Sequence, residues 1–371
     1  MRRPVLALSA FAVILIAAVV PAAADVTRTL KGEIAPGPNE SWVVENLAGR
    51  MRVTAGSGSA VTATVTVHAE SDELANLIKV EQVNGEKGRM TLRVVYPLDK
   101  HTTYRYSGNG KSDNASFWGM FDSGSSTVEY AGRRVKISGK SGVALYADID
   151  IQVPARLGQG LLRNYVGRME GKGLEGTLTF DTASGDMDLA DLKGTIGADT
   201  GSGDVHITDV KGSLDCDTGS GNVTVEGFEG DLLKGDVGSG DISIRAGSIG
   251  RVDLDTGSGD VRLKAAEVQE LKADTGSGDV TFDIGGGSLK RASFSTGSGD
   301  VTLRLGPDAS FEARVDQGSG DMDNRFGDAV PIVQGREVIG YKRGDGRAKI
   351  DVETGSGDFL LEPGSASASR R

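Results

Sequence analysis

The sequence predicts an all-β protein whose main part is a parallel β-solenoid built from 18–21-residue repeats, each with a Gly-Ser-Gly-Asp turn. The first observation is the repeat itself, because DTGSGDV or a near variant occurs nine times in the C-terminal half. The second is the alternation of apolar and polar residues on both sides of each turn, which is typical of strands. A recurring period of this length indicates stacked supersecondary units, and two short strands per period favour a solenoid.

Each copy is located by the glycine that precedes its acidic or amide residue. Successive glycines are separated by 18, 18, 19, 19, 19, 21, 21 and 37 residues. We expect each copy to lie one coil from the next, with an insertion at about residues 326–347 lengthening the last interval. The glycines are Gly185, Gly203, Gly221, Gly240, Gly259, Gly278, Gly299, Gly320 and Gly357.

Residue parity predicts which side chains face the core. Apolar residues on either side of the turn share one parity, and so does the threonine that precedes the glycines. Cys216, the only cysteine, falls in an inward column and is predicted to be a small core residue. We also expect an inward ladder of threonines whose hydroxyls bond the turn backbone: Thr182, Thr200, Thr218, Thr256, Thr275, Thr296 and Thr354.

The remaining segments follow in order along the chain. Residues 1–24 have the parts of a secretory signal: two arginines, a long apolar run and a small-residue site at Ala22–Ala24. They predict an exported protein, periplasmic or extracellular at the cell surface, with no membrane span after cleavage. Residues 25–155 form a predicted N-terminal β-rich section that caps the rod and holds one short helix opened by Ser71. The solenoid is expected over residues 156–362 and a disordered tail over 363–371.

Residues 100–135 are predicted to be a Ser/Gly/Asn-rich insertion that carries large apolar side chains. Loops seldom retain such groups unless something buries them, so two interpretations remain open. The insertion either covers the end of the rod or binds a partner, which would be an envelope, surface, polysaccharide or protein ligand. The candidate residues are Tyr104, Tyr106, Phe117, Trp118, Met120 and Phe121.

Asp-Thr-Gly-Ser is also the active-site sequence of pepsin-like aspartic proteases. Those enzymes need two aspartates that share a proton, brought together from separate lobes. Here the copies are equivalent and one coil apart, so no two aspartates are singled out. We therefore predict that the protein is not an enzyme. The formal net charge of −11 also argues against a nucleic-acid partner.

Aspartates on both sides of each turn have outward parity and form two rows. Stacked carboxylates repel one another, so something must offset the repulsion. Either turn N–H groups and solvent do so, or Ca²⁺ ions bind along the rows; no other cofactor is expected. The spacing differs from that of the calcium-binding nonapeptide GGxGxDxUx, which weakens the second interpretation. The candidate metal ligands are Asp199, Asp204, Asp217, Asp255, Asp260, Asp274 and Asp279.

Tandem TGSGDV-type repeats after a signal peptide and a Val-Pro-Ala segment at residues 153–155 resemble the DUF4097 family of exported bacterial β-strand-repeat proteins, labelled as adhesins. The resemblance covers roughly residues 42–67 and 148–362. It implies a parallel β-solenoid and a bacterial envelope or extracellular setting, and it brings no catalytic residues.

The predicted function is therefore a non-enzymatic, exported envelope or surface interaction scaffold of the adhesin type. Two alternatives remain open. One is a cation-binding repeat protein that uses the stacked turn aspartates. The other is a carbohydrate-active enzyme on a β-helix, with its site at the two insertions.

Overall fold

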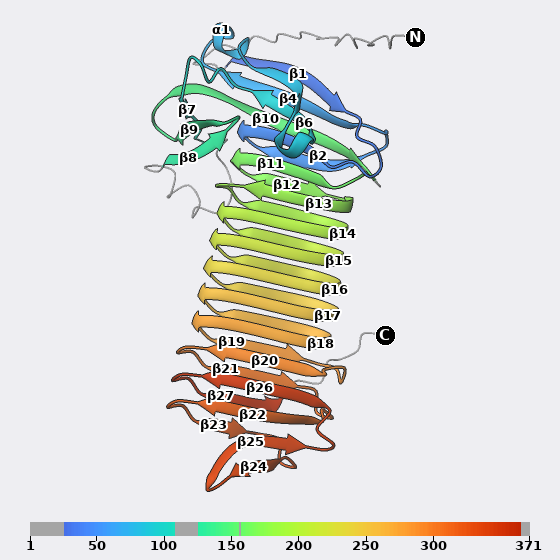
Figure 1. Ribbon diagram of the computed structural model, residues 1–371, viewed down its shortest axis with the longest axis vertical. Helices are drawn as coiled ribbons and strands as arrows, with labels where there is room; N and C mark the ends of the chain where they lie inside the picture. The colour runs from blue at the N-terminus through green and yellow to red at the C-terminus, as the bar shows by residue number, and fades with distance from the viewer. Residues whose placement is uncertain (1–25, 108–124, 156, 365–371) are drawn as a thin grey trace.

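The computed structural model describes residues 26–107, 125–155 and 157–364 (Figure 1). Nearly all of its regular structure is β-strand, which confirms the predicted all-β class. Short helical segments occur at α1 (Asp72–Ala75) and at the 3₁₀ turn η1 (Glu86–Gly88). The helix α1 begins as predicted, because the Ser71 side chain accepts a hydrogen bond from the Leu74 N–H. The predicted signal and most of the predicted tail lie outside the described residues.

The centre of the molecule is a stack of long strands, one for each repeat (Figure 1). We call the strand segments of one repeat a rung. Neighbouring rungs pair in parallel and in register, so that Thr200 lies beside Thr218 and Val205 beside Val223. Like side chains therefore form columns along the stack. The strands are β13 (Glu175–Thr182), β14 (Met187–Ser202), β15 (Val205–Ser220), β16 (Val223–Ser239), β17 (Ile242–Ser258) and β18 (Val261–Ser277).

The inward columns are buried as predicted except on the outermost rung, where Val315 and Met322 are partly buried, and they form one continuous apolar core. Cys216 is among these residues. The threonine ladder is also confirmed: the Thr200 hydroxyl donates to the Gly185 carbonyl at 3.2 Å, and Thr256 donates to Gly240 at 3.2 Å. The hydroxyls of Thr218, Thr275 and Thr296 bond the preceding turn in the same way, whereas the Thr354 hydroxyl donates to Gly357 in its own turn. The ladder satisfies polar groups that would otherwise be costly to bury.

The first rungs come from segments that are far apart in the sequence. Strands β2 (Trp42–Ala48) and β3 (Met51–Gly56) pair in parallel with β11 (Gly160–Val166) and β12 (Met169–Lys172). On their other side, β2 pairs with β6 (Met90–Val95) and β3 with β10 (Val143–Pro154). In the threonine column these rungs carry Asn46 and Asn164, and the Asn46 amide donates to Asn164 Oδ1 at 3.0 Å.

The rest of the N-terminal section covers this end of the stack (Figure 1). Strand β4 (Val61–Ala69) pairs antiparallel with both β10 and β1 (Val26–Ile34), and β5 (Lys79–Asn84) pairs antiparallel with β6. A small second sheet joins β7 (Thr103–Arg105), β8 (Ser125–Tyr130) and β9 (Arg133–Ser138). Its β8–β9 turn lies beside the first rungs, where the pocket described below is formed.

At the other end the rungs do not follow the order of the sequence. Strand β26 (Ala348–Thr354) pairs with β20 (Arg291–Thr296) on one side and with β22 (Phe311–Gln317) on the other. Likewise β27 (Phe359–Pro363) lies between β21 (Val301–Leu305) and β23 (Met322–Asn324), while β19 (Val280–Ile284) pairs with β18 and β21. The last copy of the repeat is therefore inserted between the two copies before it.

The expectation that every copy lies one coil from the next is thus wrong for the seventh and eighth copies, because the ninth copy lies between them. The physical reason is the hairpin β24 (Val330–Gln334) and β25 (Glu337–Arg343), which lies within the predicted insertion at residues 326–347. Strand β25 pairs antiparallel with β22 and so occupies the outer edge of that rung. The returning chain then pairs on the other edge of β22, against β20.

Candidate functional site

The aspartates that follow the turn glycines form a hydrogen-bonded row. Each side chain accepts the backbone N–H of the equivalent residue on the next rung: Asp204 N–H donates to Asp186 Oδ1 at 3.0 Å, and Asp279 N–H donates to Asp260 Oδ1 at 2.9 Å. Asn222 takes one place in the row and bonds in the same way. Three of the candidate metal ligands, Asp204, Asp260 and Asp279, therefore each use one carboxylate oxygen to join two rungs.

The aspartates that precede the turn threonines form a different row. The register stacks Asp181, Asp199, Asp217, Asp236, Asp255 and Asp274 directly beside one another. Partial burial, and then the charge of the neighbouring aspartates, raises the pKa of Asp199, Asp217 and Asp255. The other four candidate metal ligands belong to this row. Their mutual repulsion is a cost that the folded rod carries at neutral pH.

Asp217→Asn should stabilise the protein at pH 7 by a few tenths of a kcal/mol, because it removes a like-charge contact with both neighbouring rungs. The raised pKa means that the stability due to this carboxyl is present at low pH and is lost as the pH rises through the folded-state pKa. The advantage of the variant should therefore disappear below about pH 4. Urea unfolding at both pH values measures this difference.

The matched control is Asp204→Asn, which reproduces in the hydrogen-bonded row what Asn222 already does. We expect it to leave the urea midpoint nearly unchanged at either pH. If Asp217→Asn destabilises the protein at pH 7, stacked repulsion is not what limits this row.

The calcium alternative finds no support in the structure. Within residues 26–107, 125–155 and 157–364, no group of three or more His, Cys, Asp or Glu side chains is placed to hold a metal ion. We expect calcium chloride and sodium chloride at matched ionic strength to raise the melting temperature equally, because both salts screen the repulsion between the aspartates that precede the turns. A larger rise with calcium, reversed by a chelator, would instead indicate specific binding.

The structure places two of the six candidate partner-binding residues, and both are buried. The Tyr104 hydroxyl donates to the His101 carbonyl at 3.2 Å, and the Tyr106 ring lies 5.1 Å from that of Tyr146. These tyrosines therefore belong to the core of the N-terminal section rather than to an exposed surface. Phe117, Trp118, Met120 and Phe121 lie outside the described residues, and their role stays a prediction.

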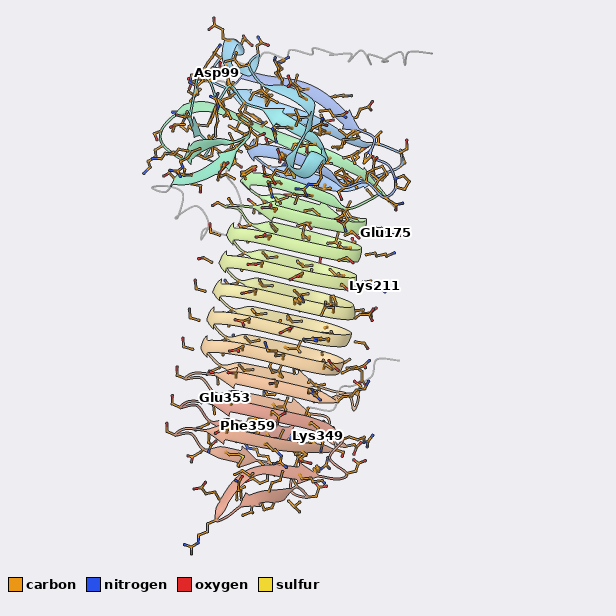
Figure 2. All side chains as sticks on the ribbon, viewed as in Figure 1. Asp99, Glu175, Lys211, Lys349, Glu353 and Phe359 are labelled. Atoms are coloured by element: carbon orange, nitrogen blue, oxygen red, sulfur yellow. The ribbon has the colours of Figure 1, made fainter. Side chains whose placement is uncertain are left out.

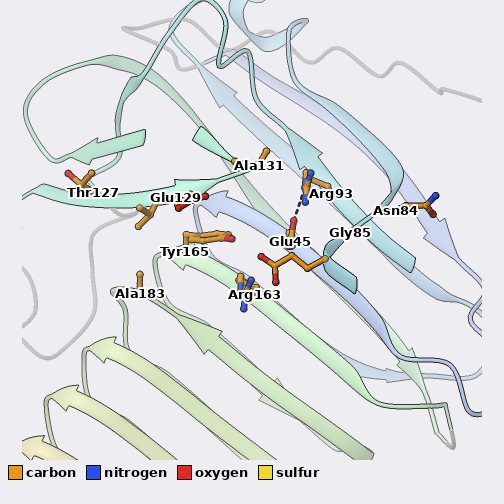
Figure 3. Close-up of a pocket in the computed structure, with 13 residues that line it drawn as sticks. Glu45, Asn84, Gly85, Arg93, Thr127, Glu129, Ala131, Arg163, Tyr165 and Ala183 are labelled. Atoms are coloured by element: carbon orange, nitrogen blue, oxygen red, sulfur yellow. Dashed lines mark hydrogen bonds and ion pairs between the residues drawn. The ribbon is translucent and has the colours of Figure 1, made fainter. Parts of the chain in front are cut away.

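A pocket of about 660 Å³ lies where the N-terminal section meets the first rungs (Figure 3). Strands β6, β2 and β11 lie side by side here and direct Arg93, Glu45 and Arg163 outward into one column. Strand β8 with the β8–β9 turn, the segment from β5 to η1, Tyr165 on β11 and Ala183 after β13 provide the other lining residues. The pocket is lined by Glu45, Asn84, Gly85, Glu86, Arg93, Thr127, Val128, Glu129, Ala131, Gly132, Arg163, Tyr165 and Ala183.

Two ion pairs fix the arginines of the pocket. Arg93 Nε donates to Glu45 Oε2 at 2.6 Å, and the Glu45 side chain is only 7% exposed. Arg163 Nε donates to Asp181 Oδ2 at 2.7 Å, across to the next rung. A buried carboxylate without a partner would be strongly destabilising, so the position of Glu45 depends on Arg93.

Tyr165 provides an aromatic surface next to these pairs. The Arg163 guanidinium carbon lies 5.7 Å from the centre of the Tyr165 ring, and the ring packs edge-on against Tyr130 at 5.2 Å. Burial raises the pKa of the Tyr165 phenol, so its hydroxyl keeps its proton at neutral pH and can donate a hydrogen bond.

Arg93, Glu45 and Arg163 continue the row of aspartates that precede the turns, since they stand in register with Asp181. Sequence reasoning missed this site. The signal available was the 18-residue period, which reaches Arg163 when counted back from Asp181. Glu45 and Arg93 could not be found in this way, because long segments separate their rungs from the regular repeats.

The comparison with family models identifies one family. The model described as Toastrack DUF4097 matches residues 62–362. Among the residues that the structure describes, no helix is long and apolar enough to cross a membrane. No curated protein matches the chain.

Three solved structures are among those that match the chain. A "putative adhesin" from Bacteroides fragilis is 11% identical, with 90% of this chain and 96% of that chain covered and a TM-score of 0.35. A "putative lipid binding protein" from Parabacteroides distasonis is 14% identical, with the same coverages and the same TM-score. A "putative adhesin" from Parabacteroides merdae is 9% identical, with coverages of 90% and 95% and a TM-score of 0.28.

Proposed function

Because the chain belongs to the Toastrack DUF4097 family, which its match over residues 62–362 establishes, we propose that it is a non-enzymatic interaction scaffold of the bacterial cell envelope. In this proposal the protein is exported, its repeats form a parallel β-solenoid, and the solenoid is a stiff rod. The pocket at the N-terminal end of the rod is the recognition site for an envelope or surface ligand.

The observation that carries the proposal is the contrast between the repeats and the N-terminal end. The rungs use their inward residues for one core and their turn residues for bonds between rungs, such as Asp279 N–H to Asp260 Oδ1 at 2.9 Å. The N-terminal end instead gathers charged, amide and aromatic side chains from four separate parts of the chain around one pocket. Pockets of about 300–1,000 Å³ with a few convergent polar groups are the usual form of a small-ligand site.

The mature protein, starting at Asp25, should be recovered from the periplasm or the cell surface, and N-terminal sequencing of that material checks export and cleavage. Immobilised mature protein should retain material from an envelope extract. Because Asn84 and Glu129 are exposed at the pocket, the double variant Asn84→Ala/Glu129→Ala should lose this retention without a change in melting temperature.

The control is Glu175→Ala. Glu175 (Figure 2) is an exposed residue of β13 that does not line the pocket, and the variant should retain envelope material as the wild type does. If the pocket variant retains as much envelope material as the wild type, the pocket is not the recognition site. Release of new reducing ends from envelope polysaccharide by the wild type, abolished in the pocket variant, would contradict a non-enzymatic role.

A further inference from the structure

The charges of the pocket are nearly balanced before any ligand arrives. Its lining includes two arginines, Arg93 and Arg163, and three glutamates, Glu45, Glu86 and Glu129. Arg93 is held by Glu45 at 2.6 Å, and Arg163 by Asp181 at 2.7 Å. An anionic ligand would compete with the carboxylate that already neutralises each guanidinium, and it would be repelled by the remaining glutamates.

A neutral ligand with many hydroxyl groups meets no such competition. A guanidinium has five N–H donors and a carboxylate has about four acceptor positions, so a single ion pair leaves hydrogen-bonding capacity on both partners. A hydroxyl both donates and accepts, so a single hydroxyl can accept a hydrogen bond from the guanidinium and donate one to the carboxylate of the same ion pair. The Asn84 amide, the Thr127 hydroxyl and the protonated Tyr165 phenol add groups of the same neutral kind.

The pocket also offers apolar contacts and an open mouth. The Tyr165 ring and the methyl groups of Ala131 and Ala183 contribute apolar surface among the polar groups (Figure 3). Such a mixture suits a ring whose faces are apolar and whose edge carries hydroxyls. Asn84, Glu86, Thr127, Glu129, Ala131, Gly132 and Ala183 are exposed, so one unit of a longer chain can enter the pocket.

We propose that this pocket binds a neutral saccharide unit, with the Arg93–Glu45 and Arg163–Asp181 pairs hydrogen-bonding its hydroxyls beside Tyr165. This inference rests on the proposed function, since it names the ligand class of the same site. The sugar could belong to an amino-sugar glycan of the cell wall or to a neutral hexose polysaccharide of the surface. Both present uncharged pyranose rings to the pocket.

The test is a titration of the mature protein with three trisaccharides, followed by calorimetry and saturation-transfer NMR. The probes are the N-acetylglucosamine trimer, maltotriose and the anionic trigalacturonate. We expect one of the two neutral trisaccharides to bind, and its identity distinguishes the two sources. Asn84→Ala/Glu129→Ala should weaken that binding about tenfold or more, the effect of losing one to two hydrogen bonds, while Glu175→Ala should not change it.

Three outcomes would overturn the inference: no binding of either neutral trisaccharide up to about 10 mM, tighter binding of trigalacturonate, or neutral binding unaffected by the double variant. We expect the melting temperatures of both variants to equal that of the wild type. Loss of trisaccharide binding would then reflect loss of the binding site rather than unfolding. The proposed function fails separately. If the mature protein retains envelope material through the pocket but binds no trisaccharide, the scaffold role stands and the saccharide does not.

Discussion

Val261→Asp should unfold the protein or split the rod at that rung, with a loss of about 4 kcal/mol or more in the free energy of unfolding. Val261 is fully buried, and its column neighbours are Ile242 on one rung and Val280 on the next. A carboxylate at this position would enter an apolar stack that offers it no partner. Urea unfolding followed by far-UV circular dichroism measures the loss.

The matched control is Ser243→Asp on the neighbouring strand. Ser243 belongs to an outward column, where the register places it beside Arg262. The new carboxylate would stay in solvent next to a guanidinium, so we expect a change within about 0.5 kcal/mol. Equal losses for the two variants would mean that the inward and outward columns have been assigned wrongly.

The damage from Val261→Asp should also be local at first. In a stack of repeats each rung contacts only its neighbours, so one weak rung separates two stable parts. Limited proteolysis of the variant should therefore cut near β17 and β18 and release fragments from either side. The wild type should resist cleavage there.

The features that could be predicted from the sequence are those that depend on residues close together within one repeat. Thr218 lies inward because its parity matches that of Cys216, and this relation holds within a few residues of one strand. The Ser71 cap is likewise local, since a side chain three residues from its donor decides it. Periodicity and capping depend on interactions between residues that are close in the sequence, and nine copies repeat the same pattern.

The order of the last rungs could not be read in the same way, because the copies are interchangeable. Ala292, Ala313 and Ile350 occupy the same column, and each would fit beside either of the others. The choice depends on the β24–β25 hairpin, whose pairing with β22 is a long-range event. The pocket could not be predicted for a similar reason. Glu45 lies far from Arg93 and from Arg163 in the sequence, and only the pairing of β2 with β6 and with β11 brings them together.

The close approach of neighbouring turns makes a second strong prediction, at the glycine before Asn222. Gly221 has φ of +141°, a conformation that other residues rarely adopt. A Cβ atom on Gly221 would lie 2.1 Å from the carbonyl oxygen of Gly203 on the preceding rung. Gly221 is therefore required for two reasons: its backbone conformation and the small space between the rungs.

Gly221→Ala should lower the free energy of unfolding by about 3 kcal/mol or more, because backbone strain alone costs about 1–3 kcal/mol and the overlap adds to it. The neighbouring change Ser220→Ala is the control: Ser220 is exposed and ends β15, so its truncation should cost no more than about 0.5 kcal/mol. Urea midpoints compare the two variants directly. Amide hydrogen exchange gives a second readout. The Thr218 hydroxyl donates to the Gly203 carbonyl on the preceding rung, so exchange in Gly221→Ala should be faster at the turns of both rungs. If Gly221→Ala and Ser220→Ala unfold at the same urea concentration, the turns are not in close contact, and the glycines of the repeat need another explanation.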